Sequence, residues 1–274
     1  MYSPPPDLAD QQRMRRAFTR SAATLGATVA GPEVWGWHGR TLSSHVEHPD
    51  RGACWLRLLS APQDKAAGKI WEGNRQAAAL FDGHIHKPLL YDTKKSGDDG
   101  YAYHAELHQY IADPIASSSP VLRADLDPPT EWWESLRTDL EHVNTVSTHR
   151  VAVRQEWVDR TVPRFLDMPG PRITGWTTAH GDLHTANLTS TTPYLLDWEG
   201  FGLAPVGYDA AMLLAYSLLV PTFANRVRDT FPVLKTQPGR DAQIIVITEL
   251  LQSASRGDHP ELVPNLRDLA AELA

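Results

Sequence analysis

The pattern of apolar residues changes once along the chain, and this change limits the folds that the chain can adopt. Between Thr28 and about Ile111, short apolar runs are separated by Gly, Pro and Asp, as in "ACWLRLLS" and "YAYHAELHQYI". Such runs are typical of antiparallel strands, and one helix is expected to interrupt them over about 65–81. After "ADPIASSSP", apolar residues recur every three or four positions, as in helices. The sequence therefore predicts an α+β protein with two lobes.

The lobe boundaries follow from the same pattern. Residues 1–108 are expected to form a strand-rich N-terminal lobe, 109–120 a hinge or linker, and 121–274 a helical C-terminal lobe. A loose proline-rich tail is expected to precede a first helix, with Asp7 near its N-cap and Gly26 after its end. Thr130 is the expected N-cap of the first helix in the C-terminal lobe.

Composition and charge narrow the classes of partner. The chain has 274 residues, of which 42% are hydrophobic and 22% charged, so a substantial core is expected. The net charge of −7 disfavours binding to nucleic acid or to an anionic membrane surface. A single cysteine, Cys54, excludes an internal disulfide and fits a reducing compartment. With no signal-like apolar region and no run long enough to span a bilayer, a soluble cytoplasmic protein is expected.

Polar groups are concentrated in the segment "TTAHGDLHTANLTSTTPYLLDWEGFG", residues 177–202. "YLLDWE" is predicted to be a short buried strand over 194–196, and its alternation would place Asp197 and Glu199 on the same side. Phosphoryl transfer needs a carboxylate that orients a hydroxyl and accepts its proton, and hard oxygen ligands for Mg²⁺. Asp182 suits the first task, and Asn187 with Asp197 suits the second.

"HGDLHTAN" followed by "LLDWE" resembles the catalytic loop and metal-binding segment of the aminoglycoside phosphotransferase/choline kinase family. The members are small-molecule kinases with a bilobal protein-kinase-like fold, and the resemblance preserves motif order over 179–211. It implies that Asp182 is the catalytic base and that Asn187 and Asp197 bind Mg²⁺. It also implies that the loop is supported by His180, His184, Glu199 and Asp209. Asp209, in "GYDAA", is expected to hydrogen-bond the loop backbone.

A nucleotide site is expected in the N-terminal lobe. In "GWHGRTLSS", Gly36 and Gly39 would let backbone N–H groups approach phosphate, and Thr41 offers a hydroxyl; a plain hairpin turn explains the same residues.

Kinase-like folds place a Lys on the next strand, paired with a Glu on the following helix. Arg57 in "CWLRL" takes this place, and Glu72 is its expected partner. Trp55 lies on the same strand face, where it would either stack on the base or narrow its slot. The adenine contact is expected near Gln109 to Ile111.

These features predict an ATP- and Mg²⁺-dependent phosphotransferase acting on a hydroxyl of a small molecule, such as an aminoglycoside or amino sugar. Two alternatives remain: a peptide Ser/Thr kinase of a biosynthetic cluster, and a nucleotide-binding pseudokinase. A metallophosphoesterase would need further Asp-x-His and Asn-His-Glu segments, which the sequence lacks. Glu249, Asp258 and Glu261 would either line an acidic cleft for a cationic substrate or lie on solvated helix faces.

Overall fold

The computed structural model describes residues 3–273 and divides into two compact units. The first unit comprises the chain up to Gly83 together with Lys87–Ala112, and the second comprises His84–His86 and the chain from Asp113 onward. The change from the first to the second unit at Ala112 and Asp113 falls inside the segment expected as a hinge. Residues 113–120 thus belong with the helical unit, which begins earlier than the predicted Val121.

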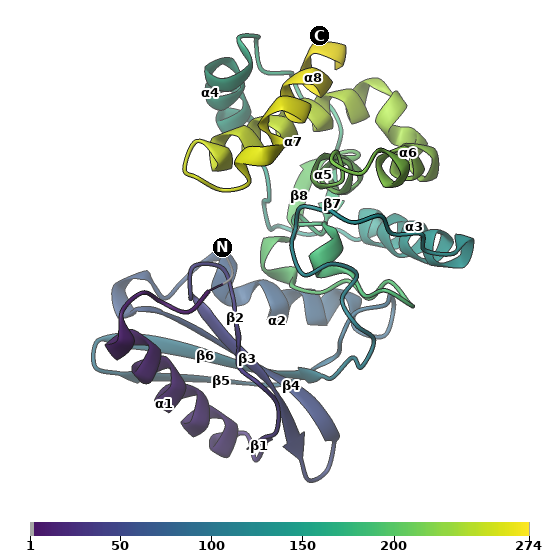
Figure 1. Ribbon diagram of the computed structural model, residues 1–274. Coiled ribbons are helices and arrows are strands. Elements are labelled where there is room, and N and C mark those ends of the chain that lie inside the picture. The colour runs from purple at the N-terminus through teal and green to yellow at the C-terminus, as the bar shows by residue number, and fades with distance from the viewer. Residues whose placement is uncertain (1–2, 274) are drawn as a thin grey trace. The chain divides into compact units, whose positions relative to one another are not determined.

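An antiparallel sheet forms the centre of the first unit (Figure 1). Its strand order is β1 (Thr28–Val29), β3 (Thr41–His48), β4 (Gly52–Pro62), β6 (Tyr101–Gln109) and β5 (Leu90–Asp98), and β2 (Val34–Trp35) also pairs with β3. Residues alternate along β4 because successive side chains point to opposite faces. Cys54, Leu56 and Leu58 are fully buried on one face, so Trp55 and Arg57 lie on the other.

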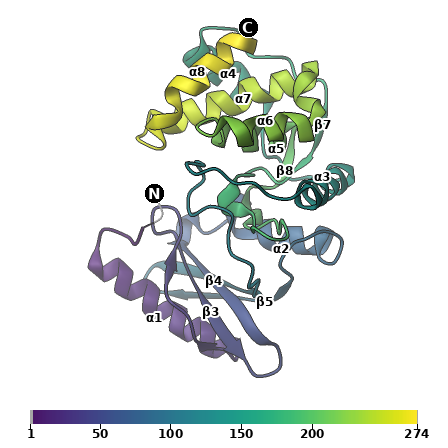
Figure 2. The ribbon, with the colours of Figure 1, turned by 45° about the vertical axis from the view of Figure 1, so that its right-hand side comes forward.

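Helix α1 (Leu8–Thr24) covers the apolar face of this sheet, along β3 and β4 (Figure 2). Met14 and Phe18 of α1 share one core cluster with Leu56 and other strand residues. The side chain of Asp7 accepts a hydrogen bond from the N–H of Ala9, which confirms the predicted N-cap. The apolar stripe of α1 thus determines which face of the sheet is closed.

Helix α2 (Lys69–Phe81) lies on the opposite side of the sheet from α1 (Figure 1). It begins at Lys69, later than predicted, because Gln63–Lys65 forms a separate 3₁₀ turn. Asn74 on α2 reaches β6, where its amide donates to Glu106. The face of the sheet that carries Trp55 and Arg57 therefore also receives polar groups from α2.

The second unit is mostly helical, as predicted. Its helices are α3 (Thr130–Thr145), α4 (Gln155–Leu166), α5 (Tyr208–Tyr216), α6 (Pro221–Thr230), α7 (Gln237–Ala254) and α8 (Val263–Leu273). Helix α7 packs against α4, α5 and α8, and α5 is buried along its whole length. Helix α6 was not predicted, and the N-cap of α3 is Pro129, so Thr130 is its first helical residue. In the described part of the chain, no helix has both the length and the apolar character needed to cross a bilayer.

Candidate active site

A two-stranded ladder brings the ends of the motif together. Strand β7 (Trp176–Ala179) pairs antiparallel with β8 (Gly202–Pro205), and Ala179 lies opposite Gly202. The loop after β7 and the segment before β8 are therefore neighbours. Gly181 has a φ of +85°, and a Cβ there would lie 2.6 Å from the carbonyl oxygen of Gly200. Only glycine permits this close approach of the two backbones.

Asp209, in the first turn of α5, holds the start of the loop. Its two carboxylate oxygens accept hydrogen bonds from the N–H groups of His180 at 2.8 Å and Gly181 at 2.9 Å. The contact expected between Asp209 and the loop backbone is therefore present. Burial and the nearby Asp182 raise the pKa of Asp209 above its usual value, although His180 and the two N–H groups act to lower it.

Asn187 fixes the other end of the loop relative to Asp182. Its amide nitrogen donates to the carbonyl oxygen of Asp182 at 2.9 Å and lies 3.4 Å from the Asp182 carboxylate. Among the described residues, none donates a hydrogen bond to the amide oxygen of Asn187. An amide oxygen left in this way is a hard donor of the kind that Mg²⁺ prefers, so the residue fits a metal ligand.

Asp182 is an ionised, accessible carboxylate. Its side chain is 47% exposed. Burial raises the pKa of Asp182, but His184, His180 and Asn187 lower it by more than burial raises it. The pKa of Asp182 therefore lies below its usual value. A carboxylate that is ionised at neutral pH can accept a hydrogen bond from an approaching hydroxyl group.

The two histidines are buried within the loop support. The His180 ring donates to the carbonyl oxygen of Leu196 at 2.8 Å and meets the Trp198 ring edge-on. The His184 ring packs edge-on against Tyr216 and is 2% exposed. These contacts are those of residues that brace the loop, since neither ring is open to solvent.

The segment from Tyr194 to Glu199 differs from its prediction. Within the described residues it forms only an isolated bridge between Leu188 and Leu195, and Trp198–Gly200 is a 3₁₀ turn. Asp197 takes the left-handed conformation, with φ +57°. The alternation that would place Asp197 and Glu199 on one side is therefore wrong, because it requires extended backbone.

The backbone nevertheless ties Asp197 to the loop. The N–H of Leu196, just before Asp197, donates to the carbonyl oxygen of Asn187 at 2.9 Å. Asp197 is exposed and is the next residue in the chain after Leu196, which is hydrogen-bonded to Asn187. This hydrogen bond joins the backbone segments that carry the two expected metal ligands, Asn187 and Asp197. Both side chains offer oxygen atoms, so this part of the structure fits Mg²⁺.

Arg150 also supports this segment, and no sequence motif pointed to it. Its guanidinium donates to the carbonyl oxygens of Phe201 at 2.9 Å and Glu199 at 2.8 Å, and it lies over the Phe201 ring. Arg150 lies far from the motif in sequence, between α3 and α4. Only the fold brings it to the turn after Asp197.

In the first unit, packing explains the glycines of "GWHGRTLSS". A Cβ on Gly36 would lie 1.9 Å from the Thr41 hydroxyl oxygen, across the hairpin. Gly39 has a φ of +68°, and a Cβ there would lie 2.6 Å from Pro5. The proline-rich segment is therefore not a loose tail, since Pro5 packs on this turn and accepts a hydrogen bond from Gln11. A role for Gly36, Gly39 and Thr41 in holding phosphate remains a prediction.

The partner of Arg57 corrects the sequence-based pairing. Arg57 donates from Nη1 to Glu106 on β6 at 3.0 Å, and the two residues are direct neighbours in the β4–β6 ladder. Glu72 instead accepts a hydrogen bond from Gln76 on its own helix at 2.9 Å. The α2 side chain that joins the cluster is Asn74, which donates to the same oxygen of Glu106 at 2.8 Å. "AELHQY" contained the acidic residue, but only strand register reveals what it faces.

Aromatic rings lie beside this cluster at the end of β6. Trp55 stacks with Tyr110 at a centroid distance of 6.3 Å, and Tyr110 stacks with His45 at 4.6 Å. Gln109, one of the expected adenine contacts, donates its N–H to the carbonyl oxygen of Leu89. Its N–H is therefore committed to the sheet, and a base edge would have to be read by other backbone groups of 109–111.

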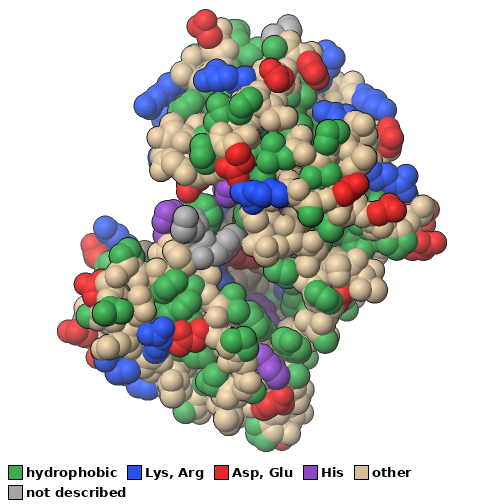
Figure 3. All heavy atoms as spheres, in the orientation of Figure 1, with side chains coloured by type: hydrophobic (Ala, Val, Ile, Leu, Met, Phe, Trp, Pro, Cys, Tyr) green, Lys and Arg blue, Asp and Glu red, His purple; other side chains and the backbone are tan. Residues whose placement is uncertain are grey.

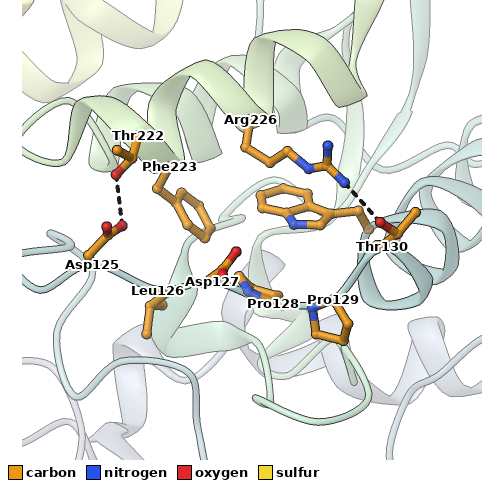
Figure 4. A pocket seen from close by; sticks show the side chains of 10 residues that line it. Asp125, Leu126, Asp127, Pro128, Pro129, Thr130, Thr222, Phe223 and Arg226 are labelled. Carbon is orange, nitrogen blue, oxygen red and sulfur yellow. Dashed lines mark hydrogen bonds between the residues drawn. The ribbon is translucent and has the colours of Figure 1, made fainter.

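A cavity of about 730 Å³ in the second unit lies between the start of α3, α6 and residues 125–130 (Figure 4). A smaller cavity of about 200 Å³ shares several lining residues with it and includes Thr185 of the loop after β7. Asp182, Asn187 and Asp197 line neither of them. These two cavities therefore do not contain the carboxylates of the motif.

Comparison with known proteins gives two kinds of relative. The sequence profile of the phosphotransferase enzyme family matches residues 4–235. A structure of amicoumacin kinase in complex with AMP-PNP, Ca²⁺ and Ami is similar with a TM-score of 0.57 and 11% identity, over 94% of this chain and 92% of that one. A putative fructosamine-3-kinase from Haemophilus somnus 129PT has a TM-score of 0.55 and 11% identity, over 96% and 98% of the two chains. No curated protein matches significantly by sequence.

The chain belongs to the phosphotransferase enzyme family, because the profile covers most of its length. The two structural relatives share the fold of this chain, and their sequence identity of 11% supports no conclusion beyond the fold. The predicted family and the predicted bilobal, protein-kinase-like fold are both confirmed.

Proposed function

From its membership of the phosphotransferase enzyme family, we propose that the protein transfers the γ-phosphoryl group of ATP to a hydroxyl group of a small molecule. Asp182 is the residue that orients the hydroxyl and accepts its proton. The observation that carries this assignment is the hydrogen-bonded loop: Asp209 holds its first two N–H groups, and Asn187 holds Asp182. In phosphoryl transfer most of the catalysis comes from positioning and electrostatic stabilisation, so a rigid loop with one accessible carboxylate suits the reaction.

Mg²⁺ would be held by the amide oxygen of Asn187 and the carboxylate of Asp197. When bound, Mg²⁺ would offset the negative charge of the phosphate oxygens. The amide nitrogen of Asn187 donates to the carbonyl oxygen of Asp182, and the N–H of Leu196 donates to the carbonyl oxygen of Asn187. In the first unit, Arg57 would hold phosphate oxygens through the fork of its guanidinium. A structural relative bound to AMP-PNP and Ca²⁺ supports the use of a nucleotide and a divalent cation.

The acceptor is proposed as a small polar molecule, since the names of both structural relatives refer to kinases of small molecules. Of the acidic residues considered for a cationic substrate, Glu261 pairs with Arg123, and Glu249 accepts a hydrogen bond from Tyr208. These two contacts favour structural roles for Glu261 and Glu249. The face shown in Figure 3 has acidic and basic side chains interspersed, in keeping with the proposal that no nucleic acid or membrane surface is bound. An ATP-dependent enzyme with one thiol fits the cytoplasm.

The test is turnover by the full-length protein with Mg²⁺-ATP and a panel of hydroxyl compounds, including aminoglycosides, amino sugars and Ser- or Thr-containing peptides. Asp182→Ala should abolish transfer while leaving the thermal unfolding temperature within about 2 °C, because its side chain is partly exposed. Asp268→Ala, an exposed aspartate on α8, is the matched control. Turnover of Asp182→Ala within a few-fold of the wild type would show that Asp182 is not the base.

Asp197→Ala should remove Mg²⁺-dependent binding of AMP-PNP in calorimetry, and unchanged binding would contradict the metal assignment. If wild-type protein binds nucleotide but transfers to no acceptor in the panel, a pseudokinase is favoured. Transfer to peptides alone would favour a peptide kinase.

A further inference from the structure

The guanidinium of Arg57 on β4 is held by the carboxylate of Glu106 on the neighbouring strand β6. Glu106 is 1% exposed, and its Oε2 accepts hydrogen bonds from both Arg57 Nη1 and Asn74 Nδ2. His108 lies on the same face with its Nε2 3.5 Å from that oxygen. A buried carboxylate needs such partners, because burying an uncompensated charge is costly.

Helix α2 provides an amide to this cluster. Asn74 is 4% exposed and points to Glu106, whereas Glu72 of the same helix points to Gln76. An acidic partner of Arg57, Glu106, therefore lies within the sheet, and Asn74 of the helix contributes a neutral donor. This division of roles is a feature of the tertiary structure that the motif order did not indicate.

We infer that Glu106 and Asn74 are positioning residues for the nucleotide phosphates, fixing the guanidinium of Arg57 through one shared carboxylate oxygen. The inference rests on the proposed nucleotide binding by Arg57. A guanidinium holds its N–H donors in one rigid plane, so anchoring Nη1 restricts the direction of the whole group.

The backbone determines this geometry. Arg57 and Glu106 face each other because β4 and β6 pair in a register that continues from Cys54 and Gln109 to Pro62 and Tyr101. A pair between adjacent strands keeps its spacing as long as the ladder is intact. Asn74 adds a hydrogen bond from α2, so its loss should disturb Arg57 less than the loss of the Glu106 charge.

The first experiment measures binding of Mg²⁺-AMP-PNP to the full-length protein by calorimetry, with thermal unfolding as a check on folding. Glu106→Gln removes the charge while keeping the shape, and it should raise Kd by roughly tenfold or more, as is typical when a group that orients a ligand-binding residue is lost. Asn74→Ala should raise Kd by a smaller factor. Glu47→Gln, on β3 of the same sheet, is the matched control and should leave Kd unchanged. Glu72→Gln tests the competing assignment and should also have little effect.

The second experiment moves the charge to the helix. Arg57 and Asn74 donate to the same oxygen, so their donor atoms lie within two hydrogen bonds of each other. A glutamate at position 74 is one methylene longer than asparagine and can therefore reach Arg57. The double variant Glu106→Gln/Asn74→Glu should recover most of the affinity lost in Glu106→Gln. A purely structural role for Glu106 would give no such recovery of affinity.

The outcomes separate the two proposals. If the wild type does not bind Mg²⁺-AMP-PNP, the proposed function fails, and this inference fails with it. If the wild type binds and folded Glu106→Gln binds equally well, only the positioning role is overturned. A larger loss in Glu72→Gln than in Glu106→Gln also overturns it. If Glu106→Gln does not fold, Asn74→Ala and the double variant decide: unchanged affinity in Asn74→Ala, or a double variant that folds without binding, overturns the inference.

Discussion

Glu106 makes the stability of the first unit depend on pH below the neutral range. Burial raises its pKa, but Arg57, His108 and His104 lower it to about 2, from a usual value of 4.5. The unfolded chain therefore binds a proton at a higher pH than the folded one. The stabilisation is fully present above about pH 5 and is lost as the pH falls through 4.5 toward 2.

The size of the effect follows from this shift. The full difference of pKa corresponds to about 3 kcal/mol of unfolding free energy, at about 1.4 kcal/mol for each pKa unit. By pH 3 the glutamate of the unfolded chain is almost fully protonated, while Glu106 in the folded protein is still mostly ionised. About 2 kcal/mol of the stabilisation is therefore lost at this pH. The sign is firm because the folded state holds the carboxylate against a guanidinium that stays charged throughout.

The assay compares wild type with Glu106→Gln at pH 6, 4 and 3. Amide hydrogen exchange of β4 and β6 reports opening of the first unit alone, which matters because a protein with two units need not unfold in one step. Wild type should be more stable than the variant at pH 6, and this advantage should shrink by about 2 kcal/mol at pH 3. An advantage that stays constant over this range would refute the reasoning, because Glu106 would then have the same pKa in both states.

Three further predictions concern the catalytic loop. Gly181→Ala should lower the unfolding free energy by about 1–3 kcal/mol more than Gly83→Ala. Both glycines have positive φ, but of the two only Gly181 lies close to another backbone segment, at Gly200. Denaturant titration of both variants checks this difference. Asp209→Asn should lower kcat about 10- to 100-fold with a smaller change in the KM for ATP, because it loosens the loop that carries Asp182 without touching the nucleotide; steady-state kinetics would contradict this if KM alone changed. Arg150→Lys keeps the charge but cannot bridge two carbonyls, so it should raise the Mg²⁺ concentration for half-maximal nucleotide binding by about tenfold; equal Mg²⁺ dependence would exclude support of Asp197 by Arg150.

The sequence by itself determined the family and the division into a sheet unit and a helical unit, and it supplied the residues of the loop that we propose as catalytic. These are local properties. The period of apolar residues differs between strands and helices, and a loop that must place a carboxylate and an amide a few residues apart keeps them together in the chain. The N-cap at Asp7 and the contact of Asp209 with the loop backbone belong to the same class, since each follows from a short motif.

The tertiary structure alone decided which distant groups meet. "AELHQY" gave no sign that Glu106 faces Arg57, because register depends on how two strands pair, and a shift by one residue reverses every side chain. Likewise, Asp197 was expected at the end of a strand, but the backbone turns there in the left-handed region, where Leu196 bonds Asn187. The apolar residues of "YLLDWE" specify burial, and burial is compatible with either conformation. Contacts between segments far apart in sequence therefore determine how Asp197 is presented and which carboxylate holds Arg57.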